Sequence, residues 1–168
     1  GIETNKKARK IAEKRLKSRI LENIDDLKVE DKFDAISLWH VLEHLSDPDQ
    51  AMKKLHHHST KNAALVIGVP NRESYDAKLY DQYWAAYDVP IHFWHFTKKD
   101  IDNLAEKTGW KVDAVLPMSL DAYYVSLLSE LYKRGRKNWI KSFLVGLMSN
   151  YKGGKTNTSS LIYVLKKT

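Results

Sequence analysis

The sequence predicts an α/β fold built on a sheet of parallel strands. The first observation is an apolar run at residues 35–39, which is short enough to be one strand buried on both faces. The second is a helix start soon after it, where Asp47 suits the N-cap, Pro48 the first helical position and Gln50 the capping-box spacing. The third is another buried strand at residues 63–69, which a Pro-Asn pair ends.

The composition is that of an ordinary globular domain. The chain has 168 residues, of which 43% are hydrophobic and 29% charged, and this is enough for a single core. It contains no apolar run that could span a bilayer and no signal-peptide pattern. Cysteine is absent, which excludes disulfides, thiolate catalysis and Cys-ligated zinc. These features favour a cytoplasmic protein.

The formal net charge of +7 would raise the encounter rate with anionic partners such as nucleic acid or acidic membranes. The Lys and Arg residues are spread over several segments and are not gathered with aromatic side chains that could stack on bases. We therefore expect a solvated surface and no nucleic-acid partner. A non-enzymatic basic module that binds nucleic acid or membranes is kept as an alternative.

The N-terminal part predicts one helix followed by a polar segment. Residues 6–20 have helical periodicity, with their apolar positions on one face and most of the Lys residues off it. We expect this helix to pack on the sheet with its polar face in water. Residues 21–32 are polar and carry five acidic groups, which suits a solvated turn.

Beyond the second strand, residues 72–96 carry eight aromatic side chains, which argue against disorder in so long a segment. Thr97 and Asp100 form a capping box for a helix that ends at Gly109. Residues 110–116 and 160–165 have the pattern of strands.

Residues 119–155 predict two inserted helices. Apolar residues keep helical spacing in the second one, and a basic run at residues 133–137 comes just before it. This insertion could be extra core, a lid over a substrate, or a peripheral membrane contact through residues 133–151. We favour core or lid, because amphipathicity alone does not distinguish a membrane face from the other two.

The segment HVLEH, residues 40–44, follows the first strand at its carboxyl end, where ligands bind in open α/β sheets. Taken alone it matches the inverted zinc-protease motif, with His40 and His44 as ligands and Glu43 as base. That site requires one continuous helix, whereas here a strand lies directly before the motif. A zinc-dependent hydrolase is therefore the alternative function, and we assign no metal.

Three segments in this order resemble class I S-adenosylmethionine-dependent methyltransferases, and more narrowly the small-molecule group that includes the ubiquinone-pathway O-methyltransferases: FDAISLWHVLEHLSDP, ALVIGVPN and PIHFWHFTKKDI. The resemblance covers about residues 1–118 and the last strand. It implies a Rossmann-like methyltransferase sheet with helices on both faces and an antiparallel final strand. The strands at 34–39 and 63–69 would then be parallel neighbours, and those at 110–116 and 160–165 an antiparallel pair.

The resemblance also implies S-adenosylmethionine as cofactor. GIETN looks like the end of the family's second strand, whose acidic residue holds the ribose hydroxyls, and a later acidic residue lies near the adenine. Six cofactor-binding positions follow from this register: Glu3, Asn5, Asp25, Asp26, Trp39 and His40.

For the reaction, the resemblance implies a small-molecule methyl acceptor, with oxygen or nitrogen as the accepting atom. Methyl transfer is an in-line displacement that depends mainly on alignment, and such acceptors benefit from a general base. His44 and His92 are the candidates, because imidazole titrates near neutral pH. Related enzymes that act on small-RNA 3′ ends hold a divalent ion with ExxEH and a later His. Here His40 replaces the first Glu, which weakens the case for magnesium.

In the family, a first strand and its glycine-rich loop precede the position of Glu3, and the sequence contains no GxGxG. The resemblance thus implies that residues 1–168 are the C-terminal portion of a single methyltransferase domain. The first strand is central in the family, so we expect its place to be covered, for example by the N-terminal helix or by a second copy in a homodimer. We also expect weak cofactor binding by residues 1–168 alone.

Overall fold

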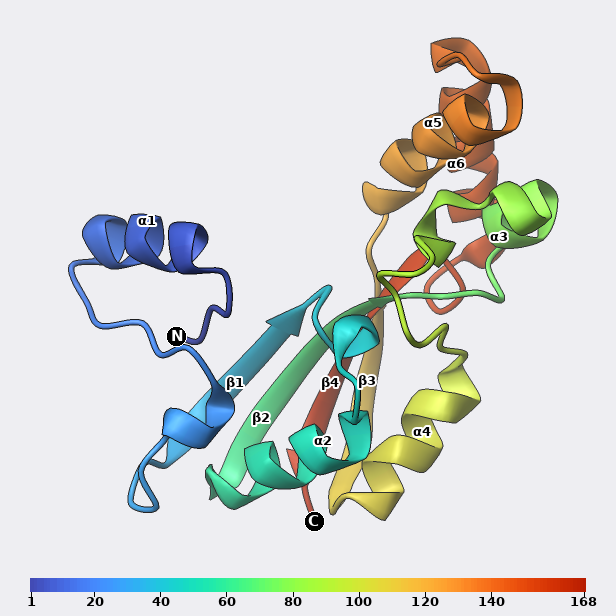
Figure 1. Cartoon of the computed structure of the whole chain (residues 1–168). Coiled ribbons are helices and arrows are strands. Elements are labelled where there is room, and N and C mark those ends of the chain that lie inside the picture. The colour runs from blue at the N-terminus through green and yellow to red at the C-terminus, as the bar shows by residue number, and fades with distance from the viewer.

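The computed structural model describes residues 1–168 and contains one four-stranded sheet of order β1-β2-β4-β3 (Figure 1). Its strands are β1 (Phe33–Trp39), β2 (Ser59–Pro70), β3 (Trp110–Pro117) and β4 (Ser160–Lys167). β1 and β2 are parallel, and β4 runs antiparallel to both β2 and β3. Both predicted strand pairs are confirmed.

Two helices cover one face of the sheet, α2 (Pro48–His57) and α4 (Lys98–Lys107) (Figure 1). They bury Met52, Leu55, Ile101 and Leu104 against the inward side chains of the strands. The indole of Trp110 belongs to this core and donates a hydrogen bond of 3.2 Å to the carbonyl oxygen of Met52. On the other face, alternate positions of β2 and β4 are only half-buried: Ala64, Val66, Ile162 and Val164.

The helix starts that the sequence predicts are present. The Asp47 carboxylate accepts the backbone N–H of Gln50 at 2.8 Å, which caps α2. The capping box of Thr97 and Asp100 begins α4. After α4, Gly109 has a φ of 82°, and a side chain there would also collide with the imidazole of His56. This chain reversal therefore needs glycine.

The N-terminal helix α1 (Lys6–Leu16) forms, but the expectation that it packs on the sheet is wrong. None of its residues is buried, and Ile11 and Leu16 are 67% and 64% exposed. Figure 1 shows α1 standing apart from the sheet beyond β1, the edge strand. The helix has no sheet surface beneath its apolar positions, so periodicity alone could not bury them.

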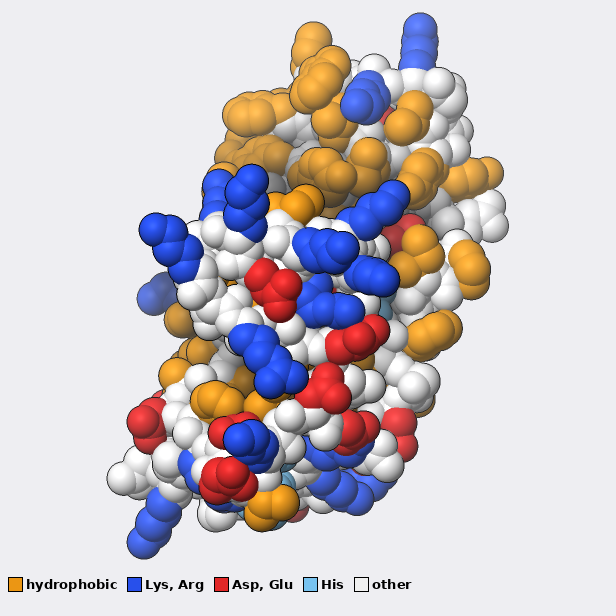
Figure 2. Space-filling view, turned by 60° about the vertical axis from the view of Figure 1, so that its left-hand side comes forward, with side chains coloured by type: hydrophobic (Ala, Val, Ile, Leu, Met, Phe, Trp, Pro, Cys, Tyr) orange, Lys and Arg blue, Asp and Glu red, His pale blue; other side chains and the backbone are white.

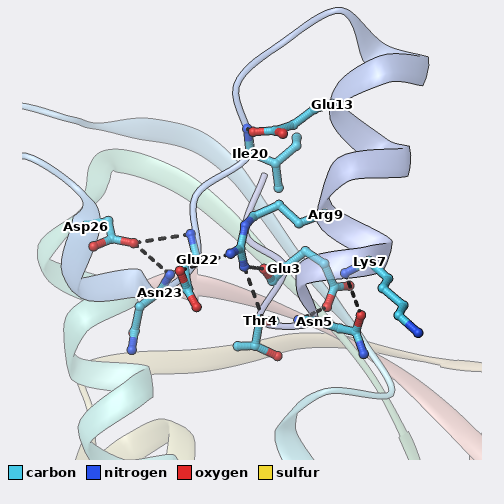
Figure 3. A network of polar contacts seen from close by, with 10 residues as sticks. All are labelled: Glu3, Thr4, Asn5, Lys7, Arg9, Glu13, Ile20, Glu22, Asn23 and Asp26. Carbon is cyan, nitrogen blue, oxygen red and sulfur yellow. Dashed lines mark hydrogen bonds and ion pairs between the residues drawn. The ribbon is translucent and has the colours of Figure 1, made fainter.

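Polar contacts hold this N-terminal segment instead (Figure 3). Arg9 donates hydrogen bonds to the carbonyl oxygens of Glu3 and Thr4 and pairs with Glu22 at 3.0 Å. A single parallel bridge joins Ile2 to Leu21. Residues 24–26 form a short 3-10 turn and no strand, as the solvated-turn interpretation predicted.

The predicted helical insertion is a hairpin of α5 (Asp121–Arg134) and α6 (Trp139–Gly153), which stands beyond the carboxyl ends of β1 and β2 (Figure 1). With α3 (Tyr75–Tyr80) it encloses a second apolar cluster centred on Tyr80 and Trp84. The large apolar side chains of α6 do not join that cluster, because most of them are exposed. The extra-core interpretation is therefore wrong for that face of α6.

Buried charges fix the hairpin to the rest of the molecule. Asp76 is fully buried and accepts hydrogen bonds from Trp84 Nε1 at 2.8 Å, Ser149 Oγ at 2.5 Å and Ser159 Oγ at 2.7 Å. These donors come from the segment after α3, from α6 and from the residue just before β4. One carboxylate thus joins the region around α3 to α6 and to the start of β4, which are more than 70 residues away in sequence.

Candidate functional site

The candidate site lies at the carboxyl ends of β1 and β2. The indole of Trp39, the last residue of β1, lies against Gly68 of β2, where an added Cβ would come within 2.9 Å of Trp39 Cε3. The indole is nevertheless 49% exposed. The absence of a side chain at Gly68 thus allows an open aromatic surface at the edge where open α/β sheets bind ligands.

His40 follows β1 in a left-handed conformation, with a φ of 50°. Its Nδ1 lies 3.2 Å from Glu43 Oε1 and its Nε2 lies 3.7 Å from Asp121 Oδ2, the first residue of α5. The hydrogen bond to Glu43 raises the pKa of His40; burial opposes this rise, and the negative charge of Asp121 adds to it. His40 thus favours the imidazolium form between two carboxylates.

Residues 40–44 do not adopt the helical geometry of the inverted zinc-protease motif. His40 ends a strand, and only Leu42–His44 forms a short 3-10 turn, so residues 40–44 are not one continuous helix. Both ring nitrogens of His40 face carboxylates of the protein, so His40 is not placed as a metal ligand beside His44.

Glu43 is the buried centre of the site. Its side chain is fully buried, with Oε1 near His40 and with Oε2 lacking a hydrogen-bond partner. Its backbone carbonyl oxygen accepts the N–H groups of Phe93 at 2.9 Å and Trp94 at 3.3 Å. Glu43 therefore fastens the end of the aromatic segment 72–96 to the carboxyl end of β1.

That contact brings His44 and His92 together, with ring centroids 4.5 Å apart and edges facing. His92 Nδ1 lies 2.8 Å from the carbonyl oxygen of Ala86, and His44 Nδ1 lies 3.3 Å from that of Ile91. A carbonyl oxygen only accepts, so Nδ1 carries the proton in each neutral ring and Nε2 keeps its lone pair. Both histidines can therefore accept a proton from a bound molecule.

Glu43, His44 and His92 each place one ligand atom within 4.8 Å of the others. One carboxylate and two imidazoles could hold a divalent ion, and backbone carbonyls orient both rings as they do in metal sites. Two nitrogen donors suit a transition metal better than magnesium. His40, which stands in the place of a further carboxylate ligand, is turned to Glu43 and Asp121 instead.

Of the sequence-predicted cofactor residues, Trp39 and His40 lie at this edge. Glu3 and Asn5 lie beyond β1, where the Glu3 carboxylate accepts the N–H of Asn5 at 2.7 Å and the Asn5 side chain caps α1 (Figure 3).

Asp25 and Asp26 lie elsewhere, in the 3-10 turn at residues 24–26 that precedes β1 in the chain. Asp25 pairs with Lys54 at the C-terminal end of α2, and the Asp26 carboxylate accepts backbone N–H groups of its own turn. A strand of seven residues is about 20 Å long, so the structure does not bring this pair to the edge that carries His40.

Sequence analysis did not identify two polar residues that lie at the site. Asp121 faces His40 and accepts a hydrogen bond from Ser160 Oγ, which ties α5 to β4. Asn71, directly after β2, donates to Asn157 Oδ1 at 2.8 Å and to the carbonyl oxygen of Thr158 at 3.1 Å. The position of Asp121 in the first turn of a predicted helix was the available signal.

Comparisons with known proteins agree with this architecture. A family model described as a methyltransferase domain matches residues 1–115. No curated protein matches the sequence. Among solved structures, the chain is similar to a SAM-dependent methyltransferase from Thermotoga maritima, described as a possible histamine N-methyltransferase, with a TM-score of 0.66 and 17% identity over 100% of this chain and 72% of that one.

Two further structures show the same likeness. One is a SAM-dependent methyltransferase from Methanosarcina mazei, with a TM-score of 0.63 and 17% identity over 99% of this chain and 80% of that one. The other is a mycolic acid cyclopropane synthase complexed with SAH and CTAB, with a TM-score of 0.64 and 10% identity over 99% of this chain and 69% of that one. At these identities the likeness shows the fold.

Proposed function

Because the chain belongs to the family of methyltransferase domains, we propose that it carries a methyl group from S-adenosylmethionine to an oxygen or nitrogen atom of a small molecule. The observation that carries this proposal is the cluster of Glu43, His44 and His92 at the carboxyl end of β1. S-adenosylmethionine supplies an electrophilic methyl group on a sulfonium.

In this mechanism the imidazoles prepare the acceptor. An acceptor O–H or N–H donates its proton to Nε2 of His92 or His44 while the acceptor atom forms its bond to the methyl carbon and the carbon–sulfur bond breaks. The buried Glu43 carboxylate lies beside both rings and stabilises the imidazolium that forms. S-adenosylhomocysteine and the proton on the base are the other products.

Alignment supplies the rest of the rate, and the fixed backbone around the site supports it. The two hydrogen bonds to the Glu43 carbonyl and the bond from Trp94 Nε1 to the Leu45 carbonyl at 2.8 Å hold the aromatic segment in place. Phe93 and Trp94 remain partly exposed beside the histidines and offer an apolar wall to a ring or chain on the acceptor.

The test is a methylation assay of the full-length protein with S-adenosylmethionine and a panel of small phenols, alcohols and amines. We expect His92→Gln to lower kcat by about 10²–10⁴-fold. His95→Gln is the matched control, because His95 lies in the same segment, also bonds a backbone carbonyl and is outside the cluster.

Chelation separates a base from a metal ligand. A base in the cluster predicts that EDTA leaves the rate of the wild-type protein unchanged. A rate that falls with EDTA and returns with a divalent ion would assign Glu43, His44 and His92 to a metal instead. Equal rates for His92→Gln and His95→Gln would exclude His92 from the reaction.

A further inference from the structure

Helix α6 turns its small side chains towards the protein and its large apolar side chains towards solvent. The residues it buries against the hairpin are small: Ser142, Val145, Gly146 and Ser149. The side chains it exposes are large and apolar, from 41% exposed at Met148 to 83% at Tyr151: Trp139, Ile140, Phe143, Leu144, Leu147, Met148 and Tyr151. Figure 2 shows dense hydrophobic side chains at the end of the molecule where Figure 1 places α5 and α6.

The inward face is fixed by close contacts, so α6 cannot turn its apolar side chains into the protein. An added Cβ at Gly146 would lie 2.6 Å from Tyr123 Cδ1 and 3.0 Å from its Cα, which shows how near α5 comes. Ser149 is bonded to the buried Asp76, and Lys141 pairs with the buried Glu130 at 2.5 Å. The fold therefore keeps the apolar face of α6 exposed.

Positive charge surrounds this face. Between residues 131 and 155 the chain has seven Lys and Arg residues and no Asp or Glu. Arg134 and Lys141 pair with Glu130, whereas Arg136 and Lys137 in the α5–α6 turn make no ion pair. Lys137 instead lies 5.8 Å from the Trp139 ring centroid, at the beginning of the apolar face.

From these contacts we infer that the outward face of α6 binds the surface of an anionic lipid bilayer. The large side chains enter the region between headgroups and acyl chains, and the basic side chains meet lipid phosphates. No helix is long and apolar enough to cross a membrane, so α6 lies along the surface. A second copy on this face is disfavoured, because it would bring more positive charge towards Arg136 and Lys137, which have no acidic partner.

The hairpin begins at Asp121, which contacts both His40 and Ser160 at the candidate site. A membrane bound at α6 therefore holds the proposed active site close to the lipid surface. The inference itself does not depend on methyl transfer, because it is tested by binding alone.

The experiment is flotation of the full-length protein with two kinds of vesicle, phosphatidylcholine alone and phosphatidylcholine containing phosphatidylglycerol. We expect binding to the anionic vesicles that weakens with added salt, and little binding to the neutral ones. The double substitution Ile140→Ser with Leu144→Ser should weaken that binding about tenfold or more. These two side chains are exposed and share one face of α6, so folding should be retained, and circular dichroism checks this.

Leu16→Ser is the matched apolar control, because Leu16 is similarly exposed on α1 and should leave binding unchanged. Arg136→Gln with Lys137→Gln should weaken binding to anionic vesicles about tenfold, whereas Lys6→Gln with Lys10→Gln should not. Absence of binding to anionic vesicles, or equal binding by the folded serine variant, would overturn the inference. A dimer in light scattering that the serine variant abolishes, without vesicle binding, would assign the face to a second copy.

Discussion

Replacing Asp76 with alanine should weaken the fold strongly. The carboxylate is fully buried and accepts hydrogen bonds from Trp84, Ser149 and Ser159 at 2.5–2.8 Å. Alanine would leave three buried donors without an acceptor, and removing one member of such a charged group costs about 3–5 kcal/mol. This is a large part of the 5–15 kcal/mol by which a whole domain is typically stable.

The assay is urea unfolding of the full-length protein, followed by circular dichroism and by tryptophan fluorescence, since Trp84 is part of the network. For a slope of about 2–3 kcal/mol per molar urea, the midpoint should fall by about 1–2 M. Asp102→Ala is the control: Asp102 is exposed on α4, and its loss should change the stability by less than about 0.5 kcal/mol.

A double-substitution series sharpens the test. Ser149→Ala and Ser159→Ala should each cost about 1 kcal/mol in the wild-type background, because each removes one donor. Added to Asp76→Ala, they should cost almost nothing further, since their acceptor is already gone. A cost of less than about 1 kcal/mol for Asp76→Ala, or full additivity with the serine substitutions, would refute the reasoning.

Two further predictions concern the cofactor and pH. In the full-length protein, Glu3→Ala should weaken binding of S-adenosylmethionine by about 1–3 kcal/mol in calorimetry, through loss of charge-assisted hydrogen bonds, while the exposed Glu106→Ala should not. Unchanged affinity would remove Glu3 from the site. The folded-state pKa of His40 is raised, chiefly by Glu43, so its contribution to stability is complete below its ordinary pKa of 6.5 and is lost as pH rises through the raised value. The excess stability of the wild type over His40→Asn should therefore shrink as the pH rises above 6.5 in urea titrations, and a constant difference would contradict this ion pair.

The strands and helix starts could be predicted because their signals are local. The run at residues 35–39 and the capping residues around Asp47 act within a few positions of themselves, and the structure forms a strand and a helix there. The resemblance added the order of strands, which local pattern does not contain. The antiparallel pairing of β3 and β4 is correct for that reason.

The site was only partly predictable, because its contacts join distant parts of the chain. His44 and His92 were both chosen from the sequence, but their proximity depends on the bonds from Phe93 and Trp94 to Glu43. The partnership of His40 with Asp121 depends on where the inserted hairpin begins. No periodic pattern encodes either contact.

Helices α1 and α6 show a related limit. Periodicity states which residues share a face, but it does not state whether a surface lies opposite that face. In α1 the apolar stripe meets no sheet, and in α6 the small residues around Gly146 face inward while the large ones face solvent. Gly146 is the residue that decides the orientation, because only a residue without a side chain fits against Tyr123.

The hydrogen bonds from Phe93 and Trp94 to the Glu43 carbonyl have a consequence for how this enzyme can change its acceptor. They join backbone to backbone, so they do not depend on which side chains stand at positions 93 and 94. The Phe93 side chain can be exchanged, by evolution or by design, while His92 keeps its place beside His44; the Trp94 indole, in contrast, also donates to the Leu45 carbonyl oxygen and helps to hold the segment. In the proposed mechanism, acceptor contact at position 93 and proton transfer to His92 are therefore separable within one short segment, which makes position 93 the first choice for a library that screens new acceptors.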